Sequence, residues 1–259
     1  AEEHAVTFAA GMAKAGLKPV FAVYSSFLQR AYDQVLHDVC AQNLPVVFAV
    51  DRAGLVGKDG ATHQGIFDLS YLSSIPNLTV MAPKNKWELS DMLKYAIAAE
   101  EPVAIRYPRG EACDLWKDQR ASIQKGCAEV LAEGTEVALF AIGSMVETAW
   151  QVRKKLAEKG IPTTVVNARF AMPLDKNCLR KLAESHPLLV TMEENVASGG
   201  FGEHVAAFLE EEALHTKVLR IAIPDCFVEH GSVGELKKAL GLDADSVTEK
   251  ILAELPEEL

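Results

Sequence analysis

Short apolar segments alternate with helix-like segments along almost the whole chain, and this alternation constrains the fold more than any other feature of the sequence. In the first half, apolar segments at 18–24, 45–51, 78–83 and 102–108 predict buried strands. The segments 27–42, 66–74 and 85–99 predict helices, and a helix over 3–15 that ends at Gly16 precedes them. Strands that alternate with helices favour a parallel sheet covered on both faces.

The second half repeats this alternation without repeating the sequence. The segment 109–126 is polar and lacks periodicity, so it predicts a connection between domains. We therefore expect an α/β protein with two consecutive parallel-sheet domains, at 1–110 and 127–259, and a linker at 111–126. In the second domain we expect strands at 136–142, 162–168, 187–192 and 217–223, and helices at 145–159, 175–185, 201–214, 232–240 and 244–255.

Two of the expected helices begin with a capping-box pattern. Asn85 is followed three residues later by Glu88, and Ser232 by Glu235. In this pattern the first side chain accepts a backbone N–H of the helix, and the glutamate reaches back to the backbone N–H of the first residue. Both glutamates are thus expected to act in capping.

Composition narrows the class of protein. The chain has 259 residues, of which 49% are hydrophobic, so it can bury a large core. Its net charge of −10 argues against a nucleic-acid surface. An apolar run of about 18 residues and a signal peptide are both absent, which predicts no membrane span. The five cysteines include no C-x-x-C pair, which predicts reduced, mostly buried thiols in a cytoplasmic protein.

The chain begins inside a helical pattern, AEEHAVTFAAGMAKAG. An α/β domain rarely opens in mid-helix, so we expect a piece of a longer or processed protein. Glu2 and Glu3 lie at the start of this helix, where the helix dipole favours carboxylates. Glu2 would gain a chemical role if it were buried against a heterocycle, because a buried carboxyl can share a proton with a ring nitrogen.

The polar loop after the second strand concentrates the residues that could carry chemistry. It contains four glycines together with Arg52, Asp59 and His63. Ligands bind at the carboxyl ends of strands in open α/β sheets. Arg52 could bind a phosphate, Asp59 could accept a hydroxyl proton, and His63 could transfer a proton near neutral pH. The structural alternative is a loop turned by its glycines, with His63 capping the next helix.

Two other strand ends supply further candidates. Tyr24, Phe27 and Arg30 follow the first strand and could line the same crevice. Phe27 could instead pack in the core, and Arg30 could be solvated. Arg106 and Arg109 follow the fourth strand; Arg109 lies beyond its end and suits a phosphate, whereas Arg106 could be a structural ion-pair partner.

The second domain shows weaker signals. GGFG at 199–202 opens a helix and favours a tight turn with close approach of helix and strand. Glu193, Glu194, Glu229 and His230 are expected in strand-end loops, and their spacing does not suggest metal ligands. The sequence holds no G-x-S-x-G motif and nothing else that indicates a serine or cysteine nucleophile.

Taken together, these segments resemble the 1-deoxy-D-xylulose-5-phosphate synthase family of the transketolase superfamily. The resemblance rests on YSSFLQRAYDQVLHDV, DRAGLVGKDGATHQGIFDLSYL and IRYPRG, supported in order by AEEHAVTFAAGMA, VVNARFAMPLD, ENVASGGFG and EHGS. It covers essentially the whole chain. It implies a pyrimidine-binding domain over 1–110, a transketolase C-terminal domain over 127–259, and an enzyme that is a thiamine-diphosphate-dependent transferase and a homodimer.

The resemblance implies a condensation of pyruvate with glyceraldehyde 3-phosphate that releases carbon dioxide and feeds isoprenoid and thiamine synthesis. Glu2 resembles the glutamate that hydrogen-bonds the aminopyrimidine ring and favours its imino tautomer, and Phe27 resembles the aromatic side chain that stacks on that ring. Tyr24, Arg52 and Arg109 resemble the substrate-phosphate pocket. Asp59 and His63 resemble the groups that contact the acceptor and assist proton transfer.

The chain departs from the family in one large respect. The diphosphate and Mg²⁺ site of the family lies on an N-terminal domain marked by G-D-G and a later asparagine, and KDG at 58–60 is not that motif. The resemblance therefore implies that a missing diphosphate-binding domain anchors both cofactors. We expect this chain alone to bind thiamine diphosphate poorly and to be inactive.

Two other functions fit the same domains. One is a β-type subunit of a 2-oxo-acid dehydrogenase, whose acceptor is a lipoyl arm, but Arg52 and Arg109 favour a sugar phosphate. The other is a non-catalytic assembly module, because large apolar domains without a partner would expose a sizeable patch. Activity with a lipoylated acceptor in place of glyceraldehyde 3-phosphate would identify the dehydrogenase subunit. Failure to bind thiamine diphosphate, even with a complementary domain present, would favour the assembly module.

Overall fold

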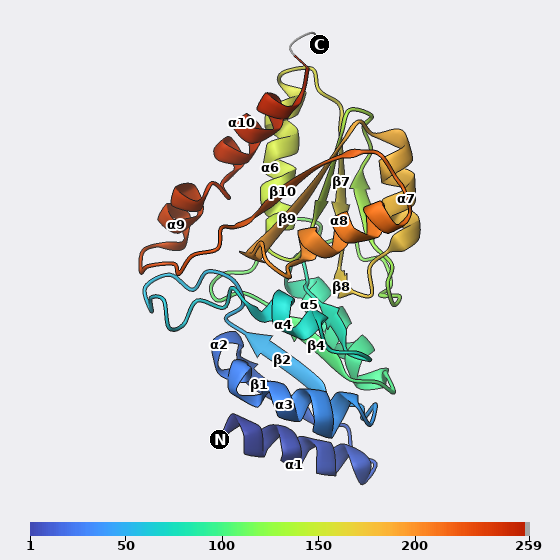
Figure 1. Ribbon diagram of the computed structural model, residues 1–259, viewed down its shortest axis with the longest axis vertical. Helices are drawn as coiled ribbons and strands as arrows, with labels where there is room; N and C mark the ends of the chain where they lie inside the picture. Colours follow the sequence, from blue (N-terminus) through green and yellow to red (C-terminus); the bar gives the residue numbers. More distant parts are fainter. Residues whose placement is uncertain (257–259) are drawn as a thin grey trace.

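A computed structural model describes residues 1–256 as two α/β layers stacked end to end, with α1 (Glu2–Lys14) at one pole and α10 (Ala244–Glu254) near the other (Figure 1). Each layer contains one five-stranded sheet. The first sheet has the order β1 (Val20–Tyr24), β2 (Val47–Asp51), β4 (Val103–Arg106), β3 (Thr79–Met81), β8 (Phe170–Met172). The second has the order β10 (Lys217–Ile223), β9 (Leu188–Val196), β6 (Val137–Ala141), β7 (Thr163–Asn167), β5 (Glu129–Ala132).

The central strands are parallel, as expected. β2 pairs with β1 and β4, and β6 pairs with β7 and β9, all in parallel register. Their side chains are buried on both faces, which is the pattern of a sheet covered by helices. The covering helices include α4 (Asp68–Ser73), α5 (Lys86–Ala98), α6 (Met145–Ala157), α7 (Lys176–Ser185) and α8 (Phe201–Glu211), and α9 (Val233–Leu240) follows the loop after β10.

Each sheet also has an antiparallel edge strand that the sequence pattern does not predict. β5 pairs antiparallel with β7, and β8 pairs antiparallel with β3. β8 follows β7 in the chain but joins the first sheet, and it is the strand that reaches down between the layers in Figure 1. It has only three residues, so no period-2 alternation can be recognised in it.

The predicted helix over 27–42 is a chain of short helical turns. It consists of α2 (Ser25–Leu28), the 3-10 turn η1 (Gln29–Ala31), α3 (Tyr32–Gln34) and a π-helix η2 (Val35–Cys40). The apolar spacing is helical throughout, but the hydrogen-bond pattern changes three times. Irregular turns of this kind often occur at functional sites, and α2 carries Phe27.

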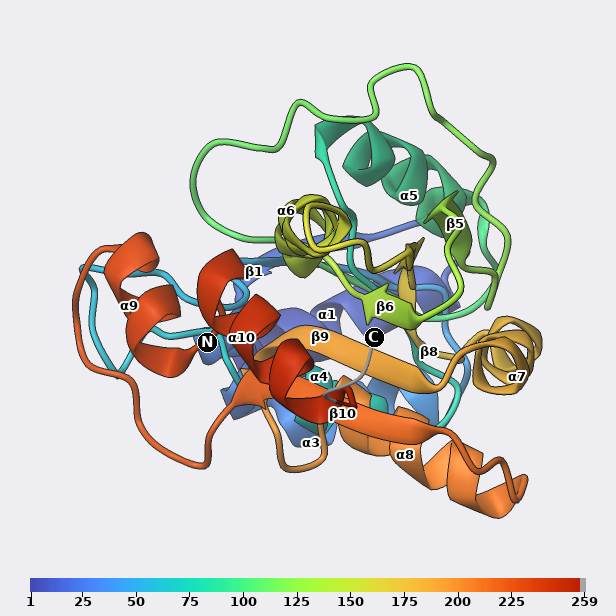
Figure 2. The same ribbon diagram turned by 90° about the horizontal axis from the view of Figure 1, so that it is seen from above.

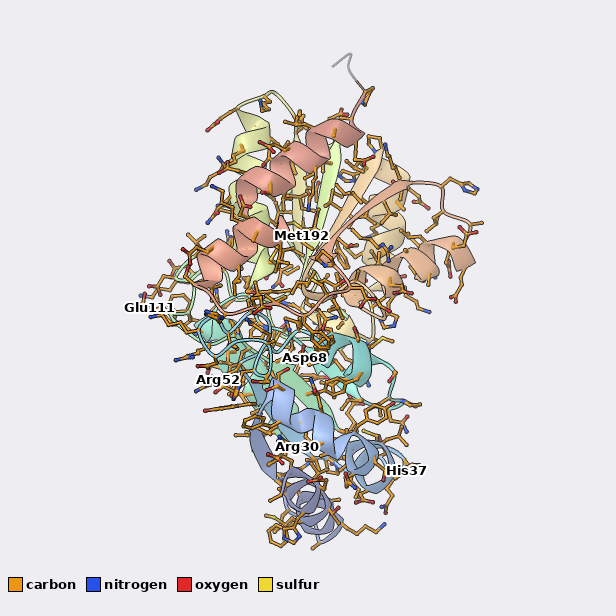
Figure 3. The ribbon with its side chains drawn as sticks, turned by 60° about the vertical axis from the view of Figure 1, so that its left-hand side comes forward. Arg30, His37, Arg52, Asp68, Glu111 and Met192 are labelled. Carbon is orange, nitrogen blue, oxygen red and sulfur yellow. The ribbon has the colours of Figure 1, made fainter. Side chains whose placement is uncertain are left out.

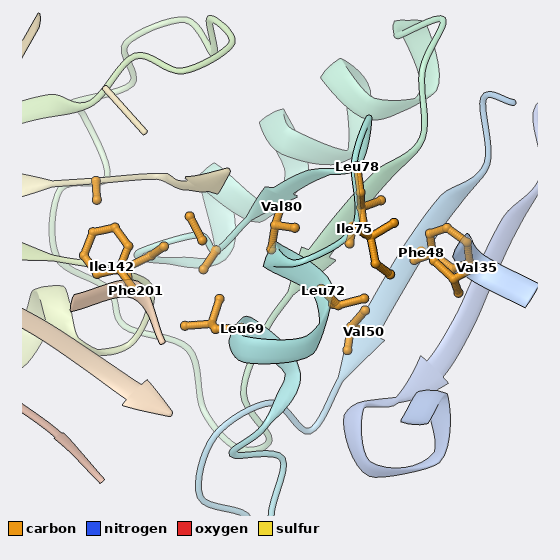
Figure 4. Packing of buried hydrophobic residues seen from close by; sticks show 14 of the residues in the cluster. Val35, Phe48, Val50, Leu69, Leu72, Ile75, Leu78, Val80, Ile142 and Phe201 are labelled. Carbon is orange, nitrogen blue, oxygen red and sulfur yellow. The ribbon is translucent and has the colours of Figure 1, made fainter. Parts of the chain in front are cut away.

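A single apolar cluster runs through both layers. It includes Val35 and Phe48 in the first layer, Leu69 and Leu72 on α4, and Phe201 in the second layer, all at most 1% exposed. Figure 4 shows these side chains in one row, with α4 between the two sheets. The second domain therefore packs directly against the first, with α4 at the contact.

A buried polar network also joins the two layers, and it corrects one expectation. Asn85 caps α5 by accepting the N–H of Glu88, as predicted. The Glu88 carboxylate does not return to the cap: it accepts hydrogen bonds from Lys84 N, Asn167 Nδ2 and Arg169 Nε at 2.7–2.9 Å. A buried carboxylate needs hydrogen-bonded and charged partners, and two of these partners, Asn167 and Arg169, come from the later half of the chain.

Other expectations have mixed outcomes. The capping box of Ser232 and Glu235 forms as predicted, and Gly16 follows α1 with a positive φ of 88°. All five cysteines are free, but only Cys40 is buried, so the expectation of mostly buried thiols was wrong. Within residues 1–256, the structure contains no helix of the length and apolar character needed to cross a membrane.

The long connection between the layers has no regular structure. No helix or strand lies between Arg106 and Glu129, and this segment runs along the outside of the molecule in Figure 2. The boundaries at 110 and 127 remain our proposal for the domain division. Residues 257–259, which the predicted second domain includes, lie outside the described residues.

Candidate active site

Three neighbouring strands of the first sheet end at the same edge, and this edge carries the candidate residues. Tyr24 at the end of β1 is in register with Asp51 at the end of β2, and Val50 is in register with Arg106 at the end of β4. Side chains that follow these strands are therefore brought together. In Figure 3, Arg52 and Asp68 lie between Arg30 in the first layer and Met192 in the second.

Aromatic rings form the centre of the site. The ring centroids of Tyr24 and Phe27 are 5.2 Å apart, and those of Phe27 and His63 are 5.6 Å apart with an edge-on geometry. The Arg52 guanidinium lies 4.0 Å from the centroid of Tyr24, a cation–π contact. Phe27 is partly buried and also packs on the main core. Phe27 therefore packs on the core and also lines the crevice, and its binding role stays a prediction.

One end of the site is a pocket of about 500 Å³ beside the start of α1. Glu2 lies at its mouth with 20% of its side chain exposed, and Arg30 lies 3.5 Å from its carboxylate and above the ring of Phe27. A hydrogen bond from its own backbone N–H lowers the pKa of Glu2, and the charge of Arg30 acts in the same direction. The lining residues are Ala1, Glu2, Ala5, Phe21, Ala22, Val23, Tyr24 and Phe27.

The other end of the site is a group of three charges. Asp59 Oδ2 accepts hydrogen bonds from Arg52 Nη1 at 2.9 Å and from Arg109 Nη1 at 2.8 Å. Arg109 is 48% exposed and Arg52 is 25% exposed, so both guanidinium groups reach solvent. Arg52 has a positive φ of 56°, which is uncommon for a side chain of this size and turns the loop back over the strand end.

The loop between Arg52 and α4 closes on itself like a small hairpin. Gly54 and Gly65 exchange backbone hydrogen bonds of 2.6 and 2.8 Å, and Gln64 accepts the N–H of Val56. Gly65 is needed because a Cβ there would lie 2.2 Å from the carbonyl oxygen of Arg52. His63 does not cap α4, since that helix begins at Asp68 with Phe67 in the cap position. The structural alternative for His63 was wrong.

Arg106 is a structural residue. It is 3% exposed and forms a two-pronged ion pair with Asp68, with N···O distances of 2.9 and 3.0 Å. Its Nη2 also donates to the carbonyl oxygens of Gly65 and Glu194. It therefore supports the floor of the site and does not face it, which agrees with the ion-pair interpretation.

Glu193 and Glu194 correct the expectation of strand-end loops. Both lie inside β9 and are at most 2% exposed. Glu193 accepts the N–H groups of Phe201 and Gly202 at the start of α8. Two adjacent acidic residues suggest a loop on composition, because isolated charges are rarely buried; here each carboxylate has donors in place of water. By contrast, Glu229 and His230 do lie in the loop before α9, as expected.

The two buried carboxyls differ in acidity. Burial raises the pKa of Glu193 to about 7, despite the two backbone donors and Arg106. Burial also opposes ionisation of Glu194, but Lys237, Ser144, the N–H of Leu55 and Arg106 together hold its pKa below the ordinary value. Glu194 is thus a buried anion.

The glycines at 199–202 form a tight turn, as predicted. Gly199 has a positive φ of 64°, and a Cβ on Gly200 would lie 2.7 Å from the Glu193 carboxylate. The helix and strand therefore approach closely here. Within residues 1–256, no group of three or more histidine, cysteine or acidic side chains is placed to hold a metal ion.

Comparison with protein families matches both layers. Residues 1–114 match the transketolase pyrimidine-binding domain, and residues 126–247 match the transketolase C-terminal domain. This chain belongs to the transketolase superfamily. The family relationship explains why two α/β layers follow one another.

Curated relatives of this transketolase-family chain are 1-deoxy-D-xylulose-5-phosphate synthases. Those of Lachnoclostridium phytofermentans and Clostridium tetani are 60% and 51% identical to it over 97% of its length. The chain spans about 40% of the length of these relatives.

Solved structures agree with the fold. A structure described as a split-gene transketolase, inactive β4 tetramer, is 29% identical with a TM-score of 0.88, over 98% of this chain and 81% of that one. Transketolase from Campylobacter jejuni is 20% identical with a TM-score of 0.73, over 92% of this chain and 36% of that one, and it supports the fold alone.

The structure brings every predicted site residue into one connected group. Contacts lead from Glu2 through Arg30 to Phe27, Tyr24 and His63, and from Tyr24 through Arg52 and Asp59 to Arg109. The contacts by which the second layer holds the loop of the site were not predicted from the sequence. Glu194 binds the loop from a strand 139 residues away in sequence, and no local pattern signals such a contact.

Proposed function

We propose that this chain supplies the pyrimidine-binding and substrate-phosphate half of a 1-deoxy-D-xylulose-5-phosphate synthase. The reaction condenses pyruvate with glyceraldehyde 3-phosphate, releases carbon dioxide, and yields a precursor of isoprenoids and thiamine. The observation that carries the proposal is the connected group from Glu2 to Arg109. It joins a carboxylate-and-aromatic pocket to a pair of solvent-reaching guanidinium groups.

The pocket beside α1 fits the pyrimidine end of thiamine diphosphate. It offers an ionised carboxylate at Glu2, the ring of Phe27 and an otherwise apolar wall. When bound, the cofactor supplies the carbanion chemistry that carbonyl condensation needs. Glu2 would accept a hydrogen bond from a ring nitrogen, and Phe27 would stack on the ring. Arg30 would keep the Glu2 carboxylate oriented.

The charged end of the site fits the acceptor substrate. Arg52 and Arg109 present planar forks that match the oxygen atoms of a phosphate. Arg52 is held against Tyr24, and both arginines converge on Asp59, so they are oriented before a ligand binds. Asp59 would accept a substrate hydroxyl group. His63, which packs edge-on against Phe27 on the same loop as Asp59, would move a proton to or from the reacting oxygen.

The diphosphate and Mg²⁺ are assigned to a complementary domain. The lining of the pocket beside α1 includes no lysine or arginine and no glycine-rich loop, so it does not suit a diphosphate. We propose that the diphosphate-binding domain completes the site, and that the assembly is a homodimer. The related split-gene chain described as an inactive β4 tetramer supports both the need for a partner and self-association.

Reconstitution tests the proposal. The 259-residue chain is mixed with pyruvate, glyceraldehyde 3-phosphate, thiamine diphosphate and Mg²⁺, with and without the diphosphate-binding domain of the Lachnoclostridium relative. Product is expected only in the complete mixture, and Glu2→Gln should abolish it. Robust turnover by the chain alone, or no turnover in the complete mixture, would overturn the proposal. Transfer to a lipoylated acceptor instead would favour a dehydrogenase subunit.

The choice of acceptor gives a second test, at Arg109. In the assembled enzyme, Arg109→Ala should raise the KM for glyceraldehyde 3-phosphate about 10- to 100-fold, the value of one charge-assisted hydrogen bond. It should leave kcat/KM for D-glyceraldehyde, which lacks the phosphate, within about twofold. Lys94→Ala, an exposed cation of α5 outside the site, is the matched control. An equal loss with both aldehydes would contradict the role of Arg109 in phosphate binding.

A further inference from the structure

The loop that carries Asp59 and His63 has a narrow neck, and the second domain holds that neck. Glu194 Oε1 accepts the N–H of Leu55 at 2.8 Å. Gly54 lies against the same carboxylate, since a Cβ there would be 2.7 Å from Oε1. On the other side of the neck, Arg106 donates to the carbonyl oxygen of Gly65 and to that of Glu194. Both sides of the neck are thus tied to one residue of β9.

The Glu194 side chain is itself fixed. Its Oε2 accepts the hydroxyl of Ser144 at 2.7 Å and lies 3.2 Å from Nζ of Lys237. Both oxygens are therefore used, and the side chain is 3% exposed. A buried carboxylate adds little to stability compared with apolar packing, so its presence needs a different reason. Its only backbone partner among the described residues is the loop.

Two further contacts hold the same loop just beyond its neck. Gln64 donates to the carbonyl oxygen of Glu229, and Gly231 donates to that of Gly57 at 3.4 Å. Lys237, the counter-ion of Glu194, lies on α9, the helix that follows Gly231. The neck and the residues next to it therefore rest on neighbouring parts of the second domain.

We propose that Glu194 is a positioning residue for acceptor binding. This inference rests on the proposed function. Glu194 fixes the neck of the loop, and the loop places Asp59 against Arg109 and His63 against Phe27. The second domain thus acts on the substrate through the loop and not by direct contact. A shift of about 1 Å in such a loop can cost on the order of a hundredfold in rate.

Kinetics of the assembled enzyme test this role. Glu194→Ala should raise the KM for glyceraldehyde 3-phosphate about tenfold or more and leave the KM for pyruvate within about twofold. Glu194→Gln keeps an oxygen for the Leu55 N–H and should restore the KM to within about threefold of wild type. Glu193→Gln is the matched control, because Glu193 is equally buried on the same strand but binds α8. It should leave both KM values unchanged.

Hydrogen exchange supplies a readout that does not depend on activity. In Glu194→Ala, amides of residues 53–65 should exchange about tenfold faster, while those of β6 and β7 stay protected. If the alanine variant does not fold, Glu194→Asp replaces it, since aspartate keeps the charge but withdraws from the loop. Unchanged exchange and KM in these variants, or equal effects in Glu193→Gln, would overturn the inference. An inactive wild-type assembly would instead overturn the proposed function, and the exchange result would still decide the role of Glu194.

Discussion

At the scale of single residues, two adjacent carboxyls of β9 have different partners because neighbouring side chains of a strand face opposite sides of the sheet. Glu193 therefore meets the start of α8, and Glu194 meets Leu55, Ser144 and Lys237. Glu194 has a cation beside it and is ionised, whereas Glu193 has mainly backbone donors and a raised pKa.

The raised pKa of Glu193 predicts a pH dependence of stability. Its pKa rises from 4.5 to about 7 on folding, so between these values the folded state binds more protons than the unfolded state. The free energy of unfolding therefore falls as the pH rises through this window, and the penalty is complete above about pH 7. Between about pH 6 and pH 8, the ionisation of Glu193 should lower the free energy of unfolding of the wild type by about 1 kcal/mol.

Urea unfolding at these two pH values measures the effect. Glu193→Gln cannot ionise, so its stability should fall about 1 kcal/mol less than that of the wild type over the same interval. The pKa of Glu194 is lowered, so that group stays ionised throughout the window and adds no slope. Parallel pH profiles for the two proteins would show that Glu193 does not titrate in this range.

At the scale of elements, the neck of the loop between Arg52 and α4 depends on a close approach of backbones. Gly65→Ala would place a Cβ 2.2 Å from the carbonyl oxygen of Arg52 and 2.8 Å from Cβ of Ser25. We expect a loss of about 1–3 kcal/mol in unfolding free energy. Gly11→Ala is the control, because nothing lies within 4 Å of that position. Helix propensity should make the control slightly more stable, by about 0.5–1 kcal/mol. Similar melting temperatures for the two variants would contradict this account of the neck.

Most elements of this chain could be predicted because their signals are local. Apolar runs such as 45–51 and the caps at Asn85 and Ser232 follow from the sequence alone. Most candidate site residues could be found for the same reason, since they lie at or after the ends of recognisable strands, whereas Glu2 lies at the start of α1 and its role came from the family resemblance. Their roles remain predictions.

What the sequence could not reveal depends on distant partners. Glu88 was expected in a capping box, but Asn167 and Arg169 from the later half bind its carboxylate. β8 has three residues and takes its place only because β3 offers a free edge. The anchoring of the loop by Glu194 likewise joins two segments that are 139 residues apart in the sequence.

At the scale of the whole molecule, the two layers should unfold together. The apolar cluster includes Phe48 of the first sheet and Phe140 of the second, and the network around Glu88 crosses the same boundary. Calorimetry should therefore show one transition with a calorimetric enthalpy close to the van't Hoff value. Arg169→Met removes one partner from the buried Glu88 and should lower the melting temperature of the whole protein on the order of 10 °C. Two separate transitions in the wild type would contradict this expectation.

Because β8 follows β7 in the chain but belongs to the first sheet, the two domains cannot be separated by cutting the connection between them. A protease cut at 111–126 would leave Phe170–Met172 with the wrong piece and strip β3 of its outer neighbour. The N-terminal piece would then carry a bare strand edge, the kind of surface that recruits other chains into aggregates. A shortened polypeptide meant for NMR or crystallisation would need to retain that strand, or to carry a proline or a charge on β3 in its place.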